Sequence, residues 1–120
     1  MAHSTLHAAV GMAAGLALGL PALRAAWRSG EPVARQAAAW IALGAACAGW
    51  ALVPSLLHFM GVPEGVRSGP WMLVFFLHPA IARLQRWTGF IGPLALAGLL
   101  AAQYTVLLAA IRRADRAARR

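Results

Sequence analysis

Acidic residues and lysine are almost missing from this sequence. It contains three acidic residues, Glu31, Glu64 and Asp115, and all 11 basic residues are arginines. Charged residues make up 12% of the chain and hydrophobic residues 61%, whereas soluble domains contain about 25% charged residues. The composition excludes an ordinary soluble domain and predicts one integral membrane domain over residues 1–120. The use of arginine alone, beside abundant alanine, is typical of GC-rich bacterial genomes.

The side chains that membrane enzymes and transporters use are also scarce. None of the acidic residues falls within an apolar segment, so no carboxylate is available for a proton relay or a coupling-ion site. The few serines and threonines form no recognisable nucleophile motif. The single cysteine, Cys47, cannot form an internal disulfide, and paired-cysteine metal motifs are absent. We therefore expect no catalytic residue, no metal site and no enzymatic activity.

The net charge of +8 does not indicate a nucleic-acid partner. The arginines stand at the ends of apolar segments, where they meet anionic lipid headgroups and determine topology. Basic residues interleaved with aromatic residues on a soluble face, the pattern of nucleic-acid binding, are absent. We expect anionic lipids as partners and no nucleic acid.

Three long stretches without a charged residue predict the transmembrane helices. A helix needs about 20 apolar residues to cross the hydrocarbon core, and each of these stretches is long enough. The sequence therefore predicts an all-α integral membrane protein, with residues 112–120 as a basic cytoplasmic tail. The predicted spans lie near residues 4–26, 36–60 and 90–112.

A fourth apolar segment, WMLVFFLHPAIARLQRW (71–87), leaves two alternatives open. As a helix it would be about 24 Å long, against a hydrocarbon core of about 30 Å. It is either a short fourth span or a helix, at about 71–86, that lies on the membrane or re-enters it. Pro79 removes a backbone donor and disfavours helical backbone at His78, so a break is expected there.

The distribution of arginine favours three spans. In that topology, one side of the membrane holds eight arginines and the other holds Arg67, Arg83 and Arg86. Four spans would divide them six to five. Because arginine accumulates in cytoplasmic loops, we expect a bacterial inner-membrane protein with an external N-terminus and a cytoplasmic C-terminus.

Tryptophans and arginines near the predicted span ends are expected to anchor the protein in the interface. Tryptophan concentrates at membrane–water boundaries, and arginine near helix ends reaches the headgroups. The expected anchors are Trp27, Trp40, Trp71, Trp87, Arg112, Arg113 and Arg116.

Glycines recur every four residues in GMAAGLALG, at Gly11, Gly15 and Gly19. Such spacing forms a groove in which another helix can approach closely. The second predicted helix has small residues of its own, and we expect Ala42, Ala45 and Gly49 to face the groove. Two interpretations stay open: packing within this chain, or docking on a partner protein.

Histidines are the candidate cofactor ligands. His3, His7 and His58 are predicted on one side of the membrane, and His78 lies inside an apolar stretch, where ionisable residues are often functional. Histidine ligates haem iron and can ligate the magnesium of bacteriochlorophyll. His7, His58 and His78 are therefore candidate ligands, although interfacial polar residues explain the same pattern.

The function expected from the sequence is that of a small, non-catalytic subunit without a cofactor. It would dock on other integral membrane subunits and stabilise a larger bacterial membrane complex; photosynthetic and respiratory complexes are candidate hosts. The alternative is a haem- or chlorophyll-binding electron-transfer or pigment protein.

Overall fold

Helices account for nearly all of the regular structure. The computed structural model describes residues 2–30, 32–67, 69–75 and 89–119. Three of its helices are long and apolar enough to cross a membrane, which agrees with the three spans expected from the sequence. The elements are α1 (Ala2–Ser29), α2 (Val33–Phe59), α3 (Glu64–Arg67), the 3₁₀ helix η1 (Pro70–Val74) and α5 (Ile91–Ala118).

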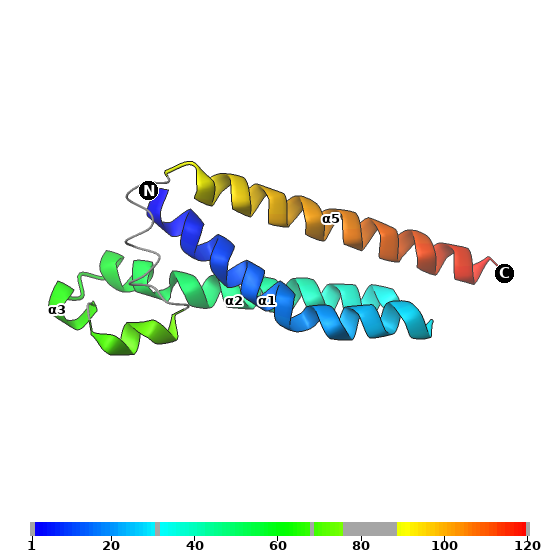
Figure 1. Cartoon of the computed structure of the whole chain (residues 1–120), viewed down its shortest axis with the longest axis horizontal. Helices are drawn as coiled ribbons and strands as arrows, with labels where there is room; N and C mark the ends of the chain where they lie inside the picture. The colour runs from blue at the N-terminus through cyan, green and yellow to red at the C-terminus, as the bar shows by residue number, and fades with distance from the viewer. Residues whose placement is uncertain (1, 31, 68, 76–88, 120) are drawn as a thin grey trace.

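Turn residues fix the ends of the first two helices. Gly30 follows α1 with a φ of 77°, a left-handed conformation that glycine adopts without steric cost. Pro32 stands directly before α2, where its missing N–H costs no helical hydrogen bond. Pro21 and Pro54 lie inside α1 and α2. Figure 1 shows that α1 bends along its length, as an internal proline favours.

The three long helices lie side by side, with α1 antiparallel to α2 and α5 running in the same direction as α1 (Figure 1). The starts of α1 and α5 meet: a Cβ added to Gly92 would lie 2.8 Å from the main-chain nitrogen of Leu6. At the opposite end, Nη1 of Arg113 donates a hydrogen bond to the carbonyl oxygen of Trp27 at 2.8 Å. The turn between α1 and α2 and the C-terminal end of α5 therefore share one end of the bundle.

The closest contact between helices is that of α1 with α2. A Cβ added to Gly15 would lie 2.6 Å from the carbonyl oxygen of Leu43 and 2.9 Å from the Cα of Gly44. Gly11 likewise lies against the backbone at Cys47. Both obstacles are main-chain atoms, so any larger residue at these two positions would force the helices apart.

The burial of the three long helices differs sharply. In the most apolar part of each helix, 56% is buried in α1, 28% in α2 and 11% in α5. The first helix is therefore the centre of the bundle, while most of the surface of α5 is not covered by the described part of the chain.

We predict that Gly15→Ala destabilises the bundle and that Gly98→Ala does not. The new methyl group at position 15 meets backbone of α2, and such overpacking costs about 1–3 kcal/mol. Gly98 has no atom within 4 Å of an added Cβ, and alanine is the better helix former by up to about 1 kcal/mol. Unfolding in mixed micelles, followed by tryptophan fluorescence, measures both changes. Equal stability of the two variants would contradict the close contact.

Candidate partner-binding surface

The inner face of α2 packs on α1 and is composed largely of small residues. Gly44 lies opposite Gly15, and the neighbouring positions along this face are buried. Since α1 presents its glycines here, the groove formed by Gly11 and Gly15 is occupied within the chain. The buried residues of α2 are Val33, Ala37, Trp40, Gly44, Ala48, Ala51 and Pro54.

The opposite side of α2 presents a second row of small residues, which we call the outer face: Ala38, Ala42, Ala45 and Gly49. All four are exposed, and nothing lies within 4 Å of a Cβ added to Gly49. Their spacing of four, three and four residues keeps them on one side of a helix with 3.6 residues per turn. A continuous strip without large side chains is thereby left uncovered by the described part of the chain.

The outer face corrects the pairing expected from the sequence. Ala42, Ala45 and Gly49 were expected to face the glycines of α1, but the structure places them on the far side of α2. Alanine and glycine occur on both sides of α2, so small residues alone could not select the contacting side. The one aromatic residue of the inner face, Trp40, distinguishes that side from the outer face.

Trp40 is buried at the α1–α2 contact and is not a membrane-interface anchor. Its side chain is 7% exposed and lies beside Gly19, whose added Cβ would be 2.8 Å from the Trp40 ring. Nε1 of Trp40 donates a hydrogen bond of 2.7 Å to the carbonyl oxygen of Leu16. That carbonyl lies one turn of α1 before Pro21, so the bond joins α2 to α1 close to the internal proline. The expectation that Trp40 belongs to the aromatic belt is wrong, because a partner for its indole lies within the bundle.

Trp27 and Arg113 link α1 to α5 at the arginine-rich end. Besides its hydrogen bond to the Trp27 carbonyl, the guanidinium of Arg113 lies 5.6 Å from the centre of the Trp27 ring. The two expected anchors therefore also bind each other. Arg112 and Arg116 are exposed on the same stretch of α5. Trp87 lies outside the described residues.

The segment that follows α3 returns along α2. Nε1 of Trp50 donates to the carbonyl oxygen of Val74 at 3.2 Å, and the Trp50 and Phe75 ring centres are 5.1 Å apart. The exposed Trp71 ring lies edge-on to Phe75 at 5.8 Å. Trp50 stands about 13 Å before the end of α2 at Phe59, so residues 70–75 run back beside the apolar part of that helix. Of the helix expected at about 71–86, the described part is the 3₁₀ helix Pro70–Val74; residues 76–88 lie outside the described residues.

The candidate cofactor ligands are placed differently from one another. His7 is 2% exposed on α1, while His58 is exposed near the end of α2. Both lie at the same end of the bundle (Figure 1). Within the described residues, no group of three or more His, Cys, Asp or Glu side chains is placed to hold a metal ion. His78 falls outside the described residues.

Gln103 is a buried polar residue that is not among the functional residues predicted from the sequence. It is 7% exposed on α5, and its Nε2 lies 3.0 Å from the position of a Cβ added to Gly44. Within the described chain, this Nε2 has no hydrogen-bond acceptor. Its strongly polar amide in an otherwise apolar helix was the feature of the sequence that could have predicted a buried contact at this position. Its place beside Gly44 brings all three long helices to one point.

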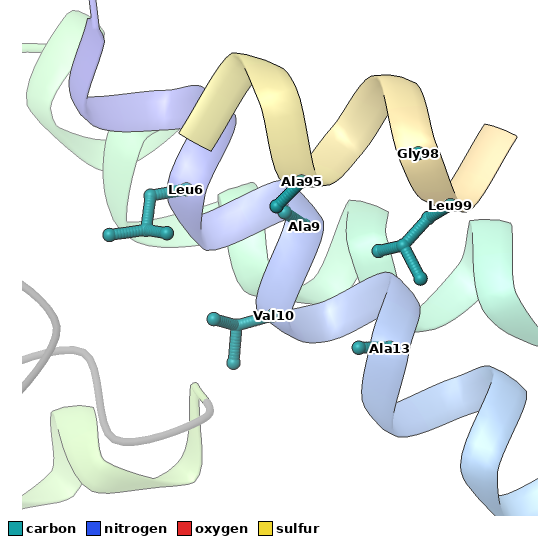
Figure 2. A pocket seen from close by; sticks show the side chains of 7 residues that line it. All are labelled: Leu6, Ala9, Val10, Ala13, Ala95, Gly98 and Leu99. Atoms are coloured by element: carbon teal, nitrogen blue, oxygen red, sulfur yellow. The ribbon is translucent and has the colours of Figure 1, made fainter. Parts of the chain in front are cut away.

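A groove between α1 and α5 is lined by apolar residues only. Its volume is about 410 Å³, and Figure 2 shows its side chains projecting from the two helices. None of the lining residues is titratable or nucleophilic, so the groove has no side chain that could act as a catalyst or bind a charged ligand. The lining residues are Leu6, Ala9, Val10, Ala13, Ala95, Gly98 and Leu99.

Comparison of the chain with protein-family models, with curated proteins and with solved structures gives no match.

We predict that Trp40→Phe destabilises the turn of α1 around Leu16. Trp71→Phe should destabilise the backbone around Val66 to a smaller extent. Both substitutions remove an indole donor to a main-chain carbonyl, but the Trp40 bond is buried and the Trp71 bond to Val66 is exposed. A buried hydrogen bond contributes about 0.5–1.5 kcal/mol. Hydrogen–deuterium exchange near Leu16 should accelerate roughly two- to tenfold in Trp40→Phe. Unchanged exchange there would show that the bond does not stabilise α1.

Proposed function

We propose that this protein is a small, non-catalytic subunit that docks on another integral membrane protein through the outer face of α2. The observation that carries this proposal is the presence of two small-residue faces on one helix. The inner face already accommodates α1 at close range, and the outer face is also rich in small residues and is exposed.

The physics of helix association in lipid supports a protein partner for this face. Lipid tails are as apolar as leucine, so apolarity alone does not drive two helices together. Small side chains favour association because they allow backbones to approach and increase van der Waals contact. The outer face meets that requirement without displacing α1, which binds the opposite side.

The exposed surface of α5 is more mixed than the outer face of α2. Large apolar side chains project from it, among them Leu94, Leu100 and Ile111, and exposed small residues such as Gly98 and Ala101 lie between them. The large side chains keep a neighbouring backbone at a distance. The outer face of α2, a row of small residues alone, is therefore the surface that we propose for close helix contact.

We predict that a photoreactive amino acid placed on the outer face crosslinks to one partner in the native membrane. Probes at Ala42, Ala45 and Gly49 should give adducts of one common mass, because these positions share a face. The matched control is Ala101, an exposed alanine of α5, which should give no such adduct. An adduct with twice the mass of the chain would show that the face binds a second copy of this protein and not a different partner. Adducts that are equally frequent at Ala101 and Ala45 would refute the docking face.

A large side chain introduced on the outer face should prevent the contact with the partner without unfolding the protein. We expect Ala45→Leu to abolish the adduct formed from a probe at Ala42, while Ala101→Leu leaves it unchanged. The fluorescence of the buried Trp40, on the other side of α2, reports that the bundle stays intact. Retention of the adduct in Ala45→Leu would contradict close packing at this face.

We further propose that the chain lies in the bacterial inner membrane with the α1–α2 turn and the end of α5 in the cytoplasm. Support comes from the arginines at that end, since arginine is retained on the cytoplasmic side. Among the described residues they are Arg24, Arg28, Arg35, Arg112, Arg113, Arg116 and Arg119, whereas Arg67 stands at the other end.

We predict that an impermeant maleimide labels Met60→Cys in intact spheroplasts and does not label Ser29→Cys or Ala118→Cys. All three positions are exposed, and Cys47→Ser provides the background without a native thiol. Lysed cells give the control, because all three cysteines should then react. Labelling of Met60→Cys and Ala118→Cys from the same side would exclude this topology.

A further inference from the structure

A second cavity opens where the α1–α2 turn meets the C-terminal part of α5. Its volume is about 380 Å³. Arg113 supplies charge to its wall, and Val33, Ala110 and Ala114 supply apolar surface. A cavity with one guanidinium and otherwise small, mostly apolar walls suits a molecule with an anionic head and an apolar body.

The electrostatics around this cavity are strongly positive. Seven described arginines stand at this end of the bundle, against one described acidic residue, Asp115. Glu31, which lies outside the described residues, adds one negative charge according to the sequence. Even with both carboxylates counted, the positive charge dominates and favours an anion.

Contacts with the end of α1 fix the position of the Arg113 side chain at the wall of the cavity. Its Nη1 is bonded to the Trp27 carbonyl, and the Trp27 ring lies 5.6 Å from the guanidinium carbon. A guanidinium carries five N–H donors, so this hydrogen bond leaves others for a ligand. Ordering the side chain in advance reduces the entropy lost when a ligand binds.

The start of α2 adds a weaker attraction on the other wall. Val33 and Ala34 line the cavity, and no side chain caps the beginning of this helix. The Arg35 N–H already donates to the Pro32 carbonyl oxygen at 3.1 Å. The N–H groups of Val33 and Ala34 come earlier in this first turn, where main-chain N–H groups have no acceptor within the helix and carry partial positive charge. They complement Arg113 rather than forming a site by themselves.

We propose that this cavity binds the phosphate of an anionic membrane phospholipid. The position favours a lipid over a soluble anion, because the cavity lies at the ends of two candidate spans and most of its lining residues are apolar. The guanidinium and the first turn of α2 bind the phosphate, and the acyl chains extend along the alanines of α5. This proposal requires the membrane-spanning fold and does not depend on the docking partner.

Native mass spectrometry of the purified chain, titrated with phosphatidylglycerol or phosphatidylcholine, tests the site. We expect phosphatidylglycerol to bind more tightly, and Arg113→Gln to weaken it roughly fivefold or more. Arg116→Gln is the matched control: it removes the same charge from an exposed position of the same helix that does not line the cavity. Its effect should be clearly smaller. If the two substitutions weakened binding equally, the interaction would be a general attraction of the lipid to the positive charge, and the proposal would be wrong.

A second variant separates the cavity from the contact between Arg113 and Trp27. Ala114→Leu fills the cavity while it preserves every charge, and it should weaken phosphatidylglycerol binding as Arg113→Gln does. Unchanged binding would show that the cavity is not the site. Equal affinity for the two lipids, or displacement of phosphatidylglycerol by millimolar inorganic phosphate, would likewise overturn the assignment to an anionic lipid.

Discussion

The close approach of α1 and α2 is the contact on which the rest of the bundle depends. In lipid, two apolar helices gain nothing by hiding from water, so their association rests on shape and on internal polar contacts. Gly11 and Gly15 remove the side chains that would separate the backbones, and Gly44 does the same from α2. Trp40 then adds a buried hydrogen bond to α1. The resulting pair provides the surface on which α5 and the returning segment 70–75 are placed.

The exposed surfaces of the bundle follow from that pairing. Once the inner face of α2 is committed to α1, its opposite row of small residues must face the surroundings. The apolar part of α5 is only 11% buried, so this helix contacts the α1–α2 pair along a narrow strip that includes Gln103 near its middle. Gly92 packs on the start of α1, and Arg113 binds near its end. The middle of α5 consequently exposes large and small side chains together, whereas the outer face of α2 exposes small ones.

The sequence predicted the number and position of the long helices because the cost of burying charge acts on every residue of a span. Gaps between charged residues were therefore sufficient to locate α1, α2 and α5. The register of α1 against α2 could not be predicted in the same way, because Ala42, Ala45 and Gly49 resemble the residues of the inner face. Likewise, proximity to a span end placed Trp40 in the aromatic belt, although a carbonyl of another helix turned it inward. The contact of Trp50 with Val74 depends on a chain reversal for which the apolar composition of both segments gives no signal.

The hydrogen bond from Arg113 to the Trp27 carbonyl also affects the order in which the three long helices can assemble. Trp27 lies in the last turn of α1, where carbonyl groups have no donor within their own helix. The donor comes from 86 residues further along the chain. During synthesis the first two helices can pair as soon as both have emerged, but the end of α1 must wait for the last helix. The last helix to be synthesised thus supplies a hydrogen-bond donor to the end of the first helix.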